Sequence, residues 1–224
     1  MDIKWYGQSC FRITAKRGEK SRNKVTILID PFDQSTGLKF YKENADILLI
    51  THDHKDHSNI EAVGGRAFLI DGPGEYEVEN IFIQGIFSYH DNKKGEERGA
   101  NTIYVMEAEG MKVCHLGDLG QKELTDSQLK EIGEVDILMI PVGGVYTIDG
   151  KEASKIISQI EPKLIIPMHY KIPGLKIDLE GPEDFLKAMG VKEKKATEKL
   201  TISKSNISED GADIVPLKAQ TKNS

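Results

Sequence analysis

The sequence has few cysteines, few aromatic residues and no long apolar segment. Its 224 residues include two cysteines, Cys10 and Cys114, and one tryptophan. Nothing else in the sequence indicates secretion, so we expect both cysteines to be free, buried thiols in a reducing compartment. No apolar run approaches the roughly 20 residues that a membrane-spanning helix needs. The N-terminus also lacks the charged and then apolar layout of a signal peptide. We therefore expect a cytoplasmic protein that is not embedded in a membrane.

The sequence also lacks a block of positive charge. Its 30 basic and 36 acidic side chains give a net charge of −6, which disfavours contact with a nucleic-acid backbone. The cluster Lys192, Lys194 and Lys195 is interrupted by Glu193 and is typical of a solvated linker. We expect a small-molecule partner and no long nucleic acid, and a homo-oligomer stays open. The length suits one domain over residues 1–218, followed by a disordered tail over 219–224.

Short apolar segments separated by turns predict many strands and few helices. Helical spacing marks Ser127–Ile132, which follows the capping residue Thr125, and also Lys151–Ile160 and Pro182–Met189. Because these helices lie between strands, we expect sheets covered by helices within one domain. The predicted strands are Ile3–Tyr6, Cys10–Thr14, Val25–Asp30, Ile47–Ile50, Ala67–Ile70, Ile81–Phe87, Thr102–Glu107, Lys112–His115, Ile137–Ile140 and Leu164–Ile166.

The segment THDHKDHS at 51–58 is the most informative motif. It follows the apolar run Ile47–Ile50, so its side chains sit in a loop held by a buried strand. Imidazole and carboxylate groups are the ligands expected for zinc and similar cations. His52 and His54, separated by one residue, can converge on one ion, while the adjacent Asp56 and His57 turn toward a second. The alternative is a solvated polar turn that happens to be rich in histidine.

The H-x-H-x-D-H pattern resembles the signature of the metallo-β-lactamase fold superfamily, and later motifs resemble it in the same order. This resemblance extends from about Ile3 to Leu217 and is greatest to small stand-alone hydrolases of the ascorbate-phosphate lactonase-like branch. It implies an α/β (α+β) four-layer αββα sandwich with a metal site at one edge between two sheets. It also implies His90 as the third ligand of the first metal, Asp118 of the HLGD segment as a carboxylate bridging both metals, and His169 on the second. The implied metal ligands are His52, His54, Asp56, His57, His90, Asp118 and His169.

The implied chemistry is hydrolysis by water that two divalent cations activate. Zinc is the expected metal, with manganese or iron as alternatives. Asp56 would orient the attacking water and accept its proton. His115 would either hold Asp118 in place or donate a proton to a leaving group. Tyr146, in a turn between a strand and a helix, is the best candidate for contact with the substrate.

Other positions are less decisive. The family branch usually has Gly-His-Ser or Gly-His-Ala near the N-terminus, whereas this chain has Gln8, which puts any role of that histidine in doubt. Asp30 could anchor the histidine loop or cap a turn. Segments 72–77 and 98–102 could line the mouth of the site, with Arg98 or Asn101 contacting substrate, or could simply be turns.

Three functions stay open from the sequence. The first is hydrolysis of an ester, lactone or phosphoester bond in a small substrate, such as a phosphorylated sugar lactone. The second is phosphodiesterase or nuclease activity, although the acidic charge disfavours long nucleic acids. The third is a non-catalytic metal-binding sensor, which a full set of ligands disfavours. We find no convincing nucleophilic triad.

Overall fold

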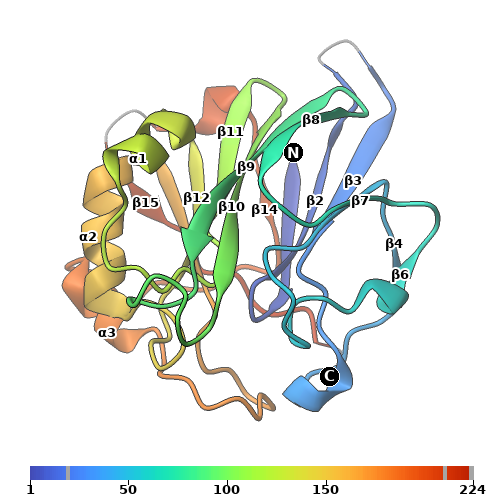
Figure 1. Cartoon of the computed structure of the whole chain (residues 1–224). Coiled ribbons are helices and arrows are strands. Elements are labelled where there is room, and N and C mark those ends of the chain that lie inside the picture. The colour runs from blue at the N-terminus through green and yellow to red at the C-terminus, as the bar shows by residue number, and fades with distance from the viewer. Residues whose placement is uncertain (19–20, 209–210, 222–224) are drawn as a thin grey trace.

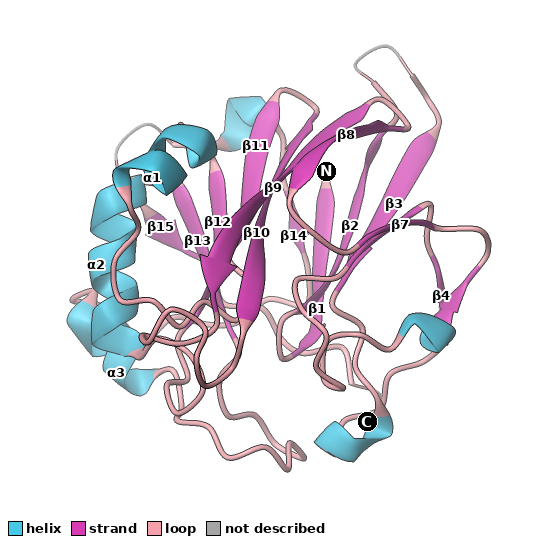
Figure 2. Cartoon of the chain, viewed as in Figure 1, coloured by secondary structure: helices cyan, strands magenta, loops and turns pink. Residues whose placement is uncertain are grey.

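Two β-sheets packed face to face form the centre of the molecule (Figures 1 and 2). The computed structural model describes residues 1–18, 21–208 and 211–221. The first sheet has the strand order β14-β1-β2-β3-β5-β7. Its strands β14, β1, β2 and β3 pair antiparallel, whereas β3, β5 and β7 run parallel. Their bounds are β1 Asp2–Gly7, β2 Cys10–Lys16, β3 Lys24–Ile29, β5 Ile47–Leu49, β7 Phe68–Ile70 and β14 Leu200–Thr201.

The second sheet has the order β15-β13-β12-β11-β10-β9-β8. It is antiparallel from β8 to β11 and parallel from β11 to β15. Every residue of β12 and β13 is buried, as expected for parallel strands covered on both faces. The bounds are β8 Gly74–Val78, β9 Ile81–Tyr89, β10 Ala100–Ala108, β11 Met111–His115, β12 Ile137–Pro141, β13 Leu164–Met168 and β15 Asp213–Ile214; β4 Glu43–Asn44 and β6 Val63–Gly64 form a separate small ribbon.

Among the described residues, three α-helices cover the outer face of the second sheet (Figure 2). They are α1 Asp126–Ile132, α2 Gly150–Ile160 and α3 Glu183–Ala188. Thr125 caps α1 as predicted, and Asp149 caps α2, each through a reciprocal capping box. The α2 helix buries Ala153, Ile156, Ile157 and Ile160. None of the described helices is long and apolar enough to cross a membrane.

The predicted four-layer αββα sandwich is confirmed, and in this chain the layer over the first sheet consists of short 3₁₀ helices and loops. Within the described residues, the outer face of the first sheet is covered by loops and by the short 3₁₀ helices η1 Gln34–Thr36 and η2 Ile60–Ala62. A separate apolar cluster that includes Phe32, Leu38 and Leu48 lies beneath these loops. This half of the sandwich therefore closes through loop side chains.

Three further details differ from the sequence-based expectations. Segment 72–77 is mostly edge strand β8 rather than a loop, and it pairs with β9. Pro182 precedes α3 instead of opening its first turn. Within the predicted disordered tail, Gln220 donates its backbone N–H to Trp5 O at 2.8 Å, so this part is packed on β1; residues 222–224 lie outside the described residues.

The two sheets meet at the carboxyl ends of their parallel strands. The Thr102 N–H of β10 donates to Thr51 O, just beyond β5, at 2.8 Å. The Tyr104 hydroxyl donates to Ile50 O at 2.9 Å. These bonds fix the loop after β5 against the second sheet. The segments that follow β5, β9, β11 and β13 consequently converge at this edge.

Candidate metal centre

The histidine loop after β5 is anchored by a buried carboxylate. Asp30, directly after β3, accepts hydrogen bonds from the Thr51 N–H at 2.8 Å and the Thr51 hydroxyl at 2.7 Å. It also lies 3.1 Å from His57 Nδ1. Asp30 has a positive φ of 47°, a conformation that asparagine and aspartate tolerate better than most residues. Of the two roles expected for Asp30, the contacts support anchoring of the loop.

The same hydrogen bonds leave the metal-facing nitrogens of two histidines free. His57 Nδ1 lies against the Asp30 carboxylate, so in the neutral ring the proton is on Nδ1 and the lone pair is on Nε2. The Thr51 hydroxyl, which donates to Asp30, accepts from His52 Nδ1 at 2.9 Å. Both Nε2 atoms are buried and form no hydrogen bond. A protein carboxylate or hydroxyl that orients an imidazole in this way is the usual support of a metal ligand.

The structure brings all the predicted ligands together. Their donor atoms fall into three overlapping groups, each within 4.8 Å. Asp118 Oδ2 lies 3.2 Å from His57 Nε2, 3.6 Å from His90 Nε2 and 3.1 Å from His169 Nε2. Two ligands of one tetrahedral zinc ion lie about 3.3–3.4 Å apart, so these separations fit shared cations. The groups are His52, His54 and His90; His52, His57 and Asp118; and Asp56, His57 and His169.

The position of Asp118 within this set agrees with the bridging role that the resemblance implies. Its Oδ2 faces histidines of both predicted positions, whereas its Oδ1 accepts a hydrogen bond from the Ser9 hydroxyl at 2.9 Å. Its backbone N–H donates to Asn101 Oδ1 at 3.0 Å. Asn101 also donates to Ser88 Oγ and Leu116 O and is buried. Asn101 therefore supports Asp118 rather than lining the mouth of the site.

His115 lies below the cluster, in a fully buried position. Its Nδ1 accepts the Gly117 N–H at 3.1 Å, so its Nε2 is the donor and bonds Ser9 O at 2.9 Å. Ser9 in turn contacts Asp118. These contacts support the expectation that His115 holds Asp118 in place. Proton donation from His115 to a leaving group would require its Nε2–H, which Ser9 already engages.

The turn between β1 and β2 is a part of the site whose contacts the sequence did not predict. Gln8 Nε2 donates to Asp56 Oδ2 at 3.2 Å and lies 3.5 Å from His169 Nε2. The Gln8 carbonyl accepts from the His169 N–H at 3.1 Å and from the Trp5 indole at 2.8 Å. Gln8 is buried with a φ of 50°. The sequence offers one signal for this turn, because Gln8 occupies the position where the family branch usually has a histidine.

Charge and burial set the protonation states of the cluster. Burial raises the pKa of Asp118, but His169 and His57 outweigh burial and hold that pKa well below its ordinary value. Burial lowers the pKa of His57, but Asp118 outweighs burial and raises that pKa. Burial lowers the pKa of His52, and it lowers that of His90 to about 4. Near neutral pH the centre therefore offers an ionised Asp118 and the neutral imidazoles of His52 and His90, which suit a divalent cation.

A cavity of about 420 Å³ opens over this centre. Its floor is formed by five predicted ligands: His54, Asp56, His90, Asp118 and His169. Its mouth is formed by Arg98 and Tyr146 together with segment 176–178. The Arg98 guanidinium carbon lies 4.6 Å from the centre of the Tyr146 ring. The volume is that of a small-molecule site.

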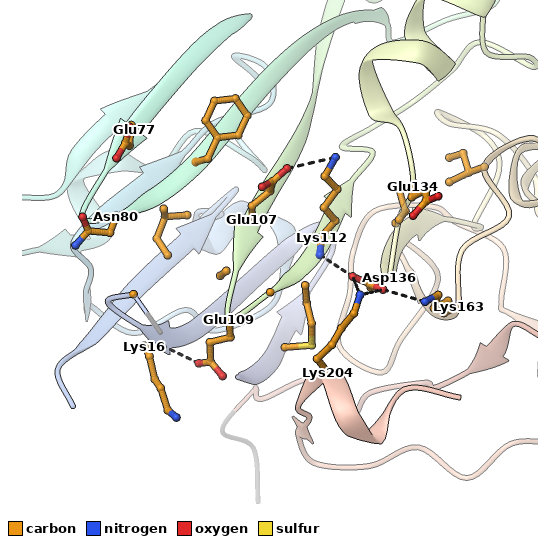
Figure 3. A pocket seen from close by; sticks show the side chains of 18 of the residues that line it. Lys16, Glu77, Asn80, Glu107, Glu109, Lys112, Glu134, Asp136, Lys163 and Lys204 are labelled. Atoms are coloured by element: carbon orange, nitrogen blue, oxygen red, sulfur yellow. Dashed lines mark hydrogen bonds and ion pairs between the residues drawn. The ribbon is translucent and has the colours of Figure 1, made fainter. Parts of the chain in front are cut away.

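A larger hollow, of about 1150 Å³, lies at the opposite end of the strands (Figure 3). Its charged side chains largely neutralise one another. Asp136 accepts from Lys204 at 2.7 Å and pairs with Lys163, and Lys112 pairs with Glu107 at 3.3 Å. No metal-binding group found among the described residues includes a residue from this hollow. We interpret this hollow as a structural groove between the edges of the two sheets.

The cysteines take no part in either cavity. Cys10 and Cys114 are free and buried, as predicted. Burial raises the pKa of both thiols, which keeps them protonated and unreactive.

Comparisons with known proteins agree with this geometry. The family model of the beta-lactamase superfamily domain matches residues 2–169. The chain is 28% identical to a UPF0173 metal-dependent hydrolase of Thermococcus onnurineus, with 85% of this chain and 92% of the relative covered. It is 30% identical to one from Thermoplasma volcanium, covering 76% and 84%. It resembles the structure of a metallo-β-lactamase superfamily protein from Thermotoga maritima with a TM-score of 0.75 and 36% identity, covering 97% and 99%.

Proposed function

Because the chain belongs to the beta-lactamase superfamily and is a metal-dependent hydrolase, we propose that it uses two divalent cations in catalysis. The bond that it hydrolyses would be an ester, lactone or phosphoester bond of a small substrate. The observation that carries the proposal is the convergence of seven histidine and aspartate side chains on one cavity. Two buried free thiols are compatible with a cytoplasmic location, which we propose as well.

The donor set supports two cation positions. His52, His54 and His90 form one group of imidazoles, and Asp56, His57 and His169 form another. Asp118 Oδ2 lies within 3.6 Å of ring nitrogens from both groups. Three imidazoles suit zinc, and the Thermotoga maritima relative is named for zinc dependence. Bound cations would lower the pKa of a shared water and polarise the bond that is attacked.

Asp56 would orient the attacking water. Its carboxylate lines the cavity and is about three-quarters buried. Burial raises the pKa of Asp56, but the hydrogen bond and charge of His57 outweigh burial and lower the pKa well below its ordinary value. Asp56 therefore stays ionised, so its carboxylate can accept a hydrogen bond from the water but would hold the water's proton only transiently. The Gln8 amide, 3.2 Å from this oxygen, restricts its rotation.

Two alternatives make different predictions. A phosphodiesterase would cleave a generic phosphodiester and leave carboxylic esters intact. A sensor would bind metal and cleave neither. The open cavity above the donors favours an enzyme over a sensor, and the net charge of −6 favours small substrates over long nucleic acids.

The test is a panel of generic aryl esters, lactones, phosphomonoesters and phosphodiesters, assayed with zinc, manganese and iron. We expect turnover of at least one class by the wild type. Asp118→Asn should lose nearly all of that turnover and bind one cation weakly, because the bridging charge is removed. Ser205→Asn, a change in the exposed 3₁₀ helix η3 Lys204–Asn206, is the control. A wild type that binds two cations and cleaves no member of the panel would contradict the proposal.

A further inference from the structure

We propose that Arg98, Tyr146 and Lys176 form an anion-binding subsite at the mouth of the cavity. The substrate would then carry a phosphate or carboxylate group away from the bond that is cleaved. This inference rests on the proposed function only in assuming that the cavity receives a substrate. All three side chains line that cavity, above the predicted metal ligands.

Arg98 is a charged group without a compensating carboxylate. Its guanidinium stacks over Tyr146, with 4.6 Å between the guanidinium carbon and the ring centre. The side chain is half-buried and forms no ion pair with any other described residue. Its neighbour Glu97 pairs with Lys93 instead. Stacking on a ring face leaves the edge N–H groups of a guanidinium free, and this edge matches the oxygens of phosphate or carboxylate.

The backbone around Arg98 is fixed relative to the metal centre. Asp91 follows the predicted ligand His90 directly, and its carboxylate accepts hydrogen bonds from four backbone N–H groups at 2.8–3.0 Å. One of these donors is Arg98 itself, at 2.8 Å. His90 is also bonded through its N–H to Gly99 O at 3.1 Å. Both ends of loop 91–99 are thus hydrogen-bonded near His90, so the backbone of Arg98 is held in a fixed position.

Tyr146 is presented by a strained turn. Gly144 and Val145 both have positive φ angles, of 57° and 58°, and the Tyr146 N–H bonds Gly144 O at 2.6 Å. A positive φ is a genuine outlier for a β-branched residue such as Val145. Strain of this kind concentrates at functional sites, where the surrounding structure holds the residue in place. Here it places the Tyr146 ring under the Arg98 guanidinium.

Lys176 brings a second positive charge to the mouth of the cavity. It is exposed and forms no ion pair within the described part of the chain. Its backbone N–H is held by Thr36 O at 2.8 Å. Asp178 is the acidic residue of the mouth and offsets one of the two positive charges. Arg98, Lys176 and Asp178 together therefore carry one net positive charge, in a protein whose net charge is −6, and this charge would attract an anion to the cavity.

The test measures binding of small anions to the zinc-loaded protein by isothermal titration calorimetry. The probes are sn-glycerol 3-phosphate, glycerate and neutral glycerol. In Arg98→Gln we expect binding of at least one anion to weaken about tenfold, because a charge-assisted pair is lost. Arg98→Lys should show a smaller loss, and Lys176→Gln a loss of about threefold, as a lone exposed charge contributes less. The control is Arg66→Gln, which removes the same charge from an exposed site outside the cavity.

The comparison between the anions identifies the group that the subsite accepts. A larger loss for the phosphate probe indicates a phosphorylated substrate, and a larger loss for glycerate indicates a carboxylate. Unchanged binding of both anions by a folded, zinc-loaded Arg98→Gln protein would overturn the subsite, as would the absence of anion binding by the wild type. Binding requires no turnover. Weakened binding without any hydrolysis in the substrate panel would therefore retain the subsite and reject only the proposed function.

Discussion

Gln8 contributes to the centre through an N–H group rather than a ligand atom. Its amide donates to Asp56 at 3.2 Å, and its own Oε1 is buried without a partner. We predict that Gln8→Leu lowers kcat by about tenfold, since one hydrogen bond to a charged group is lost. Its zinc content should stay unchanged because the leucine removes no predicted ligand. Steady-state kinetics and elemental analysis of the purified variant measure both quantities.

Two further variants control this prediction. Gln84→Leu makes the same change on β9, outside the cavity over the metals, and should leave kcat unaltered. Gln8→His restores an N–H donor and should recover most of the activity. A Gln8→Leu protein with wild-type kcat would show that Asp56 needs no support from this turn.

Some residues of the metal centre could be predicted from the sequence, and others could not. His52, His54, Asp56 and His57 occur within six consecutive residues after an apolar strand, so their pattern was visible locally. The contacts of Gln8 and Ser9 with Asp56 and Asp118 join residues 48 and 109 positions apart. Such contacts depend on how the two sheets pack, which no local pattern encodes. Likewise, only the structure showed that Asn101 supports Asp118.

At the scale of elements, loop 91–99 depends on one carboxylate. Burial raises the pKa of Asp91, but hydrogen bonds from Arg98, Gly95, Lys93 and Glu97 outweigh burial and lower it to about 2. A lowered pKa stabilises the fold fully above the ordinary aspartate value of about 3.8, and this contribution is lost as the pH falls toward 2. We predict that Asp91→Asn lowers the free energy of unfolding by about 2 kcal/mol at pH 7.

Urea unfolding of both proteins at pH 7, 5 and 3.5 tests this prediction. The difference between wild type and Asp91→Asn should be equal at pH 7 and 5 and should begin to shrink at pH 3.5. A difference that grows as the pH falls would contradict the assigned role of the carboxylate. The same variant should leave the apolar core, and therefore the cooperativity of unfolding, unchanged.

Two glycines allow the ligand-bearing segments to pack closely. A Cβ at Gly143 would lie 2.2 Å from His169 O, and one at Gly120 would lie 2.3 Å from the His90 carbonyl carbon. Because both contacts are with backbone, each substitution must displace a predicted ligand. We predict that Gly143→Ala weakens the cation held by His169, whereas Gly120→Ala weakens the cation held by His90. A tenfold loss of zinc affinity is expected at the affected position, about the effect of disturbing a ligand's support.

Chelator competition with zinc, resolved into two binding steps, measures this effect. Gly72→Ala is the control because a Cβ there meets nothing within 4 Å. Loss of the same binding step in Gly120→Ala and Gly143→Ala would contradict the assignment of His90 and His169 to different cations. Two unaltered steps in both variants would show that the backbone tolerates the added methyl groups.

Elements whose own residues show a clear apolar or capping pattern were predictable from the sequence. Elements that form only by pairing or packing with other segments were not. The apolar runs of β5, β12 and β13 and the cap at Thr125 are encoded in adjacent residues. In contrast, β8 begins at Gly74 in a glycine-rich segment and is a strand because it pairs with β9. The outer layer on the first sheet is formed by loops whose apolar residues, such as Phe32, have no helical or strand period.

Over the whole molecule, the two ends of the sandwich have different roles. The carboxyl ends of β5, β11 and β13 present the predicted metal ligands below an open cavity. The opposite end holds the larger hollow, where lysines and acidic residues pair with one another (Figure 3). The larger cavity is therefore lined by charges that pair with one another, whereas the smaller one is lined by the predicted metal ligands.

The proposed function depends most on two distinct cation positions. Crystals of the wild type, His90→Ala and His169→Ala, soaked in zinc and located by anomalous scattering, test it directly. The wild type should show two peaks on either side of Asp118. His90→Ala should keep the peak near Asp56, His57 and His169, and His169→Ala should keep the peak near His52 and His54. One identical residual peak in both variants, or a single peak in the wild type, would contradict the proposed pair of cation positions.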